Sequence, residues 1–336
     1  MAKLLVLSTA LFASFLTTAS HAEEPSFAGK TISIYASGGG YALYARALAI
    51  HIGKRLPGTP TIIIRELPGA GTLMSANYIA EAARKDGTEI GAVGGSVATV
   101  QLYKVPNVRF DPRRLIWLAS LASEAGVVAV TAKSGVSSIR DAFTHKILVG
   151  GGGPTSGNIV FPSILNGLLG TKFDIVRGYK SSEDIALAME RGEVEGVASW
   201  NWSSIKAARL DWVKSGQIKI LLQLALTGHP DLEGIPLVTD LAKTDEQRAA
   251  IQLVFSSQDI ARPYIAPPGT PPQIVDLWRR AFQETMTDPA FQADLGKMNL
   301  DSAGAKSGGE VEALIERLYA TSPDVLSKVN RWMDLK

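Results

Sequence analysis

The strongest constraint on the fold is a pattern that occurs twice: a strand-like run, a glycine-rich turn and a helical run. The first copy is "TISIYASGGGYALYARALAIHIGKR" at residues 31–55, and the second is "KILVGGGGPTSGNIVFPSILNGLLG" at residues 146–170. β-Branched and aromatic residues precede the glycines, and apolar residues recur at helical spacing after them. Alternating strands and helices predict α/β architecture with parallel sheets, in which ligands bind beyond the carboxyl ends of the strands.

The chain is too long for one ordinary core, because it has 336 residues and single cores stop growing near 250–300 residues. We therefore expect two α/β lobes whose glycine turns face a shared cleft. Two apolar runs, "AGVVAVTA" and "IKILLQLAL", flank the second copy of the pattern. They place lobe one at residues 23–125 and 227–336, and lobe two at residues 126–226.

The N-terminus, "MAKLLVLSTALFASFLTTASHAEE", resembles an export signal. Lys3 supplies the positive end, an apolar core of about 15 residues follows, and Ala22 ends an A-x-A-like cleavage site. The core is shorter than the roughly 20 residues that span a bilayer. We predict that residues 1–22 are a cleaved signal peptide and that the mature protein lies in the periplasm of a Gram-negative bacterium.

Charge and composition exclude several kinds of function. The net charge is +2, and loss of Lys3 leaves 33 basic and 32 acidic side chains, so strong electrostatic binding to nucleic acid is not expected. The chain has no cysteine, which excludes disulfides and thiolate metal sites. Neither a two-histidine metal motif nor a G-x-S-x-G elbow occurs, so no metal, no cofactor and no catalytic activity are predicted.

Each glycine turn precedes a helix, and the first N–H groups of a helix attract anions. The spacing "GGGYAL" matches neither the dinucleotide nor the P-loop motif, which argues against a nucleotide. Ser156 either caps its own helix or donates to a ligand, and Thr155 offers a second hydroxyl. The candidate ligand-binding residues are Gly38, Gly39, Gly40, Tyr41, Ser96, Val97, Gly153, Pro154, Thr155, Ser156, Gly157, Asn158, Trp200 and Asn201.

Six stretches, in order along the chain, resemble the receptors of tripartite tricarboxylate transporters, the TctC or Bug-type periplasmic solute-binding proteins. They are "SGGGYALYARALA", "LPGAGTLMSANYIAEAARKDGTEIG", "GPTSGNIVFPSILNGLLGTKF", "GYKSSEDIALAMERGEVEG", "APPGTPPQIVDLWRRAF" and "TMTDPAFQADLGKM". The resemblance implies a type II periplasmic binding protein fold, with two crossover strands joining the lobes. It also implies a small carboxylate ligand and delivery to membrane permease subunits, and a monomer is expected.

One position departs from that family's pattern. An acidic residue commonly stands two positions into the first helix, where this chain has Ala42. If Ala42 faces the site, its lack of charge favours an anionic ligand and makes an amino-acid ligand doubtful. Two other functions remain open: a ligand sensor for a membrane kinase, and an exported hydrolase or lyase.

Overall fold

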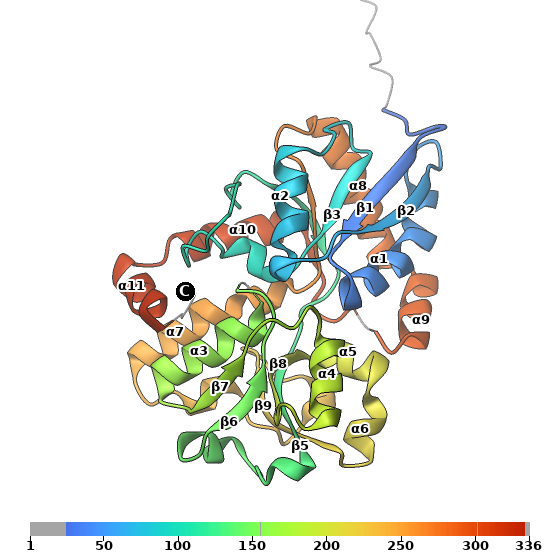
Figure 1. Cartoon of the computed structure of the whole chain (residues 1–336). Coiled ribbons are helices and arrows are strands. Elements are labelled where there is room, and N and C mark those ends of the chain that lie inside the picture. Colours follow the sequence, from blue (N-terminus) through green and yellow to red (C-terminus); the bar gives the residue numbers. More distant parts are fainter. Residues whose placement is uncertain (1–24, 155, 301, 333–336) are drawn as a thin grey trace, which may run out of the picture.

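A computed structural model of the chain describes residues 25–154, 156–300 and 302–332. These residues form two β-sheets, one in the upper and one in the lower half of the view, with helices around each (Figure 1). The expected two-lobed α/β architecture is confirmed. Residues 1–22, the predicted signal peptide, lie outside the described residues.

The sheet of the first lobe has the strand order β11-β4-β10-β3-β1-β2. β1 pairs in parallel with β2 and β3, whereas β10 runs antiparallel to β3 and β4. The strands are β1 Thr31–Ala36, β2 Thr61–Glu66, β3 Glu89–Ala92, β4 Ile116–Ser120, β10 Pro263–Ala266 and β11 Lys306–Ser307.

The sheet of the second lobe has the order β7-β6-β8-β5-β9. β6 pairs in parallel with β7 and β8, and β5 is antiparallel to both of its neighbours. The strands are β5 Gly126–Thr131, β6 Ile147–Gly150, β7 Phe173–Val176, β8 Gly196–Asn201 and β9 Ile218–Leu224. β5 and β10 are thus the first strands after the chain passes from one sheet to the other. Each of them is antiparallel to both of its neighbouring strands.

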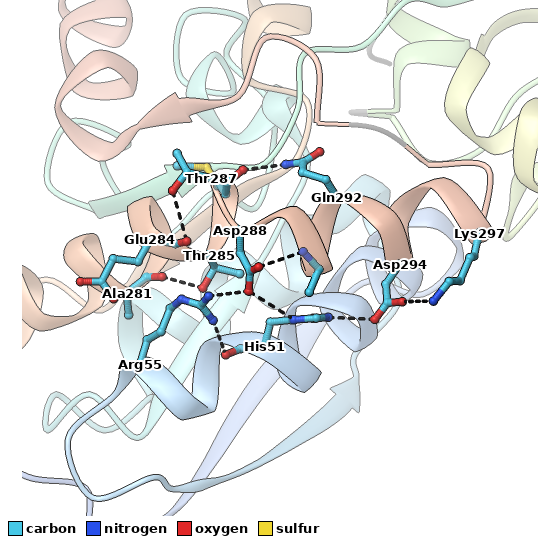
Figure 2. Close-up of polar contacts among 12 residues, drawn as sticks. His51, Arg55, Ala281, Glu284, Thr285, Thr287, Asp288, Gln292, Asp294 and Lys297 are labelled. Carbon is cyan, nitrogen blue, oxygen red and sulfur yellow. Dashed lines mark hydrogen bonds and ion pairs between the residues drawn. The ribbon is translucent and has the colours of Figure 1, made fainter.

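The first lobe is covered by α1 Gly39–Ile52, α2 Leu73–Glu81, α8 Pro272–Met286, α9 Pro289–Lys297 and α10 Gly308–Tyr319. Polar contacts join the C-terminal end of α1 to α9, although the two helices are far apart in sequence (Figure 2). His51 lies 3.0 Å from Asp294 through Nε2, and Arg55 donates to Asp288 at 2.5 Å. His51 is buried against the edge of the Phe291 ring and therefore serves packing within this lobe.

The second lobe carries α3 Gly157–Leu169, α4 Ser182–Arg191, α5 Trp202–Ala208 and α6 Leu210–Lys214. Helices α7 Asp245–Phe255 and α11 Pro323–Trp332 lie beside α3 (Figure 1). Gln247 on α7 donates to the carbonyl of Leu168 at 3.1 Å. Asn330 on α11 donates to the carbonyl of Leu102 at 2.9 Å, which ties this C-terminal helix to a first-lobe loop as well.

The chain passes from the first sheet to the second between β4 and β5, and it returns through β10. The assignment of residues 227–336 to the first lobe stays a prediction. In the structure, α7 and α11 contact α3, and buried apolar side chains of all three helices belong to one hydrophobic cluster. No helix in the described ranges is long and apolar enough to cross a membrane.

Candidate functional site

A cavity of about 570 Å³ lies between the two lobes. Short turns from both sheets line it, together with the connection that leads into β10. The lining segments fall within residues 37–41, 68–72, 95–105, 152–161, 178–183, 199–204 and 254–262. The glycine turns of both copies of the sequence pattern therefore meet at one cavity, as the cleft hypothesis requires.

The first-lobe glycines have two different structural roles. Gly38 and Gly39 have φ angles of +82° and +53°, which residues with a side chain rarely adopt. Gly40 has no such constraint, but a Cβ there would lie 3.1 Å from Ser204 Oγ and 3.4 Å from a terminal nitrogen of Arg262. Gly38 is the N-cap residue of α1 and has no side chain, so it offers no side-chain acceptor to the first N–H groups of this helix.

The second-lobe turn is held by side chains that leave α3 uncapped. Ser156 Oγ donates to the carbonyl of Gly153 and to Asn158 Oδ1, both at 2.6 Å. Asn158 Oδ1 also accepts from the N–H of Gly152 at 2.9 Å. Among the described residues, the Ser156 side chain makes no capping bond to its own helix. Two helix N-termini, from α1 and α3, therefore reach one cavity, and neither of their N-cap residues, Gly38 and Ser156, makes a side-chain capping bond in the described structure.

Arg262 lines the cavity and lies on the connection into β10. Its side chain is 1% exposed and donates to Glu124 at 2.7 Å and to Ser203 Oγ at 2.6 Å. The guanidinium also lies over the rings of Tyr41 and Tyr44, at 4.8 and 5.1 Å from their centres. Burial acts to lower the pKa of Arg262, but Glu124 and the tyrosines outweigh it, and the pKa lies above its ordinary value.

Asn201 and Ser199 come from the same strand, β8. With its amide oxygen turned toward Arg262, Asn201 accepts from both terminal nitrogens at 3.2 Å. Ser199 has a φ of +116°, at an irregularity where β8 pairs with β5. Strain of this kind, outside glycine, concentrates at functional sites.

Most sequence-predicted residues line the cavity, and their contact with a ligand stays a prediction. The lining residues are Gly38, Gly39, Gly40, Tyr41, Ser96, Gly153, Ser156, Gly157, Asn158 and Asn201. Within the described chain, Val97, Pro154 and Trp200 are not part of the lining. Thr155 lies outside the described residues.

The physical reasons for the three exceptions are local. Val97 is 1% exposed within the core, and Pro154 is exposed on the surface of its turn. Trp200 is 3% exposed and packs against Trp212, with ring centres 6.3 Å apart. Successive side chains of a strand face opposite sides, so Ser199 and Asn201 face the cavity while Trp200 faces the core.

Sequence reasoning missed Arg262, Glu124 and the second-lobe turn at residues 178–183. Arg262 and Glu124 come from separate interlobe connections, and no local motif pairs them. The turn lies in "GYKSSED", a stretch used for the resemblance but given no role in the site. Ala42 is 1% exposed in the core of the first lobe, so it does not face the cavity, and its selectivity role is not supported.

Comparison with known proteins gives a consistent result. A family model described as "Tripartite tricarboxylate transporter family receptor" matches residues 44–330. A UPF0065 protein of Bordetella bronchiseptica is 24% identical over 308 residues, covering 90% of this chain and 86% of that protein.

Two solved structures share the fold. A protein of R. palustris solved with adipate superimposes with a TM-score of 0.69 at 15% identity, covering 89% of this chain and 97% of that one. MatC of Rhodopseudomonas palustris, solved with bound malate, gives 0.65 at 17% identity, covering 91% and 98%.

Proposed function

The chain belongs to the tripartite tricarboxylate transporter receptor family, and on this premise we propose that it captures a small organic carboxylate in the interlobe cleft. The observation that carries the proposal is the meeting of two uncapped helix N-termini, from α1 and α3, at one cavity. Each end offers first-turn N–H groups that have no acceptor within the helix, and the positive end of a helix dipole. The two solved relatives with adipate and malate support the same ligand class.

The affinity needed for such a receptor is within reach of these groups. Micromolar binding corresponds to about −8 kcal/mol. Hydrogen bonds to a charged group contribute roughly 1.5–3 kcal/mol each, and each helix end adds about 0.3–1 kcal/mol. Donors from both lobes together reach this value after association costs, whereas donors from one lobe do not. The ligand therefore favours a closed arrangement of the lobes.

A binding role is favoured over an enzymatic one. The titratable side chains that line the cavity are Tyr41, Tyr103, Tyr179, Lys180, Glu183 and Arg262. No histidine of the described chain lines it, so its serines lack the usual general base. Nor do the described residues include a group of three or more acidic or histidine side chains placed to hold a metal ion.

We further propose that the protein is exported to the periplasm as a monomer and passes its ligand to membrane permease subunits. Docking on a sensor kinase is the alternative partner. Purification from the periplasmic fraction, followed by N-terminal sequencing, tests the export proposal, with Glu23 as the expected first residue. Deletion of the neighbouring permease genes should abolish uptake of the ligand, while loss of a transcriptional response alone would favour the kinase.

Isothermal titration of the mature protein against a panel of carboxylates tests the binding proposal. We expect at least one carboxylate to bind, and the corresponding carboxamide to bind far more weakly because it lacks the charge. Binding of no carboxylate, or equal binding of acid and amide, would contradict the proposal.

A further inference from the structure

We propose that the ligand is a monocarboxylate with an uncharged apolar body, and that the cleft discriminates against dicarboxylates. The inference rests on the proposed function, because it names the ligand class of the same cleft. It goes beyond that function, since helix N-termini alone would accept a carboxylate of any kind.

Six buried side chains from both lobes form a largely apolar part of the cavity lining, called here the apolar end; its one polar atom in the described structure is the hydroxyl of Tyr103, which is buried without a hydrogen-bond partner there. The six side chains are Val100, Tyr103, Val105, Val160, Phe161 and Val254. Each is at most 8% exposed, and all six belong to one contiguous hydrophobic cluster. A ligand group that enters between them leaves water for an apolar surface, which is favourable only if that group is uncharged.

The apolar end lies next to the anion site along α3. Gly157 and Asn158 form the first turn, and Val160 and Phe161 follow one turn later, about 5.4 Å along the helix axis. The Phe161 ring is so near that a Cβ on Gly157 would lie 3.3 Å from it. A carboxylate held by the first N–H groups of α3 would therefore carry its next carbon atoms against this ring.

The first lobe repeats this order. Ser96 and Thr99 line the cavity and are followed directly by Val100 and then Tyr103. Polar lining thus gives way to apolar lining within one or two turns in both lobes. A ligand with a charged head and an apolar body matches this arrangement, whereas a molecule charged at both ends does not.

No charged side chain belongs to the apolar end. Among the described residues that line the cavity, the charged ones are Lys180, Glu183 and Arg262. Arg262 is paired at 2.7 Å with Glu124, and both side chains are at most 4% exposed. A second carboxylate that entered the apolar end would therefore be buried without a cation of that lining to compensate it, and burial of an unpaired charge is costly.

Titration calorimetry with three probes of similar length tests the inference: 3-phenylpropionate, adipate and 3-phenylpropanamide. We expect 3-phenylpropionate to bind at least about tenfold more tightly than adipate, which lacks the apolar end, and than the amide, which lacks the charge. If adipate binds as tightly as 3-phenylpropionate or more tightly, the inference is wrong and the carboxylate function stands. If neither acid binds, the inference is wrong and the wider carboxylate panel decides on the proposed function; if the amide binds as tightly as 3-phenylpropionate, both proposals fail.

A near-isosteric substitution locates the apolar body. Val160→Thr places a hydroxyl in the apolar end, and Val311→Thr in α10 is the matched control, since Val311 is a buried helical valine away from the cavity. We expect Val160→Thr to weaken binding of 3-phenylpropionate about fivefold or more and to weaken binding of adipate by a clearly smaller factor. The control should leave both affinities unchanged. Equal losses for both acids in Val160→Thr would overturn the placement.

Discussion

Arg262 and Glu124 lie 2.7 Å apart, although they belong to the two separate connections that join the lobes. Glu124 also accepts from the backbone N–H of Ser203 at 3.1 Å, at the start of α5. This buried pair therefore links both connections and the start of one second-lobe helix.

We expect Glu124→Ala to lower the free energy of unfolding by about 3–5 kcal/mol, because it leaves the buried guanidinium of Arg262 without a compensating charge. Urea denaturation followed by circular dichroism measures the loss. The control is Glu193→Gln, which breaks an exposed pair with Arg191 and should cost less than about 1 kcal/mol. Similar losses in both variants would show that the buried pair of Glu124 contributes no more to the free energy of unfolding than an exposed pair does.

Gly40→Ala should lower the affinity for the ligand by about tenfold, because the new Cβ would crowd Ser204 and Arg262, at 3.1 and 3.4 Å. Gly309→Ala is the matched control. Each glycine is the second residue of its helix, and a Cβ on Gly309 would have no neighbour within 4 Å. Calorimetry with the best-binding carboxylate compares the two variants. Unchanged ligand affinity in Gly40→Ala would show that the close approach at Gly40 is not needed for the cleft to close on the ligand.

Ser199→Gly should raise the stability of the apo protein by about 1 kcal/mol, because glycine tolerates the φ of +116° that strains serine. The same change removes a cavity-lining hydroxyl and should lower the affinity for the ligand. Ser199→Ala keeps the backbone strain and removes only the hydroxyl, so it should weaken the ligand with no gain in stability. Melting temperature and calorimetry separate the two effects. A fall in melting temperature for Ser199→Gly would contradict the strain interpretation.

The contact between α1 and α9 should contribute to acid sensitivity (Figure 2). Hydrogen bonding from the N–H of Ala290 and from Arg55 lowers the pKa of Asp288, and bonding from Lys297 and His51 lowers that of Asp294. A lowered pKa means that the stabilisation is present above the ordinary aspartate pKa, about 3.9, and is lost as the pH falls through the lower folded value.

Unfolding free energies measured between pH 5 and pH 2 should therefore fall less steeply in Asp288→Asn than in the parent protein. Asp245→Asn is the control, because the Asp245 side chain is 98% exposed, and its profile should follow the parent. Parallel profiles for parent and Asp288→Asn would refute the linkage.

Much of the fold could be predicted because it depends on short-range patterns. Residues 31–55 and 146–170 each gave strand, glycine turn and helix in the expected order, since hydrophobic periodicity and glycine conformations are local properties. Trp200 shows the limit of such patterns. A strand assignment alone leaves open which of its faces meets the core, and the neighbours Ser199 and Asn201 line the cavity instead.

The sequence by itself determined the alternating α/β elements, the two glycine turns and the two helix starts whose first N–H groups can attract an anion. Only the tertiary structure decided that Arg262 meets Glu124, that α7 and α11 cover α3, and that Val100 and Phe161 share one apolar wall. These contacts join residues far apart along the chain. They depend on how two sheets and their connections pack in space, and local propensity contains no information about that packing.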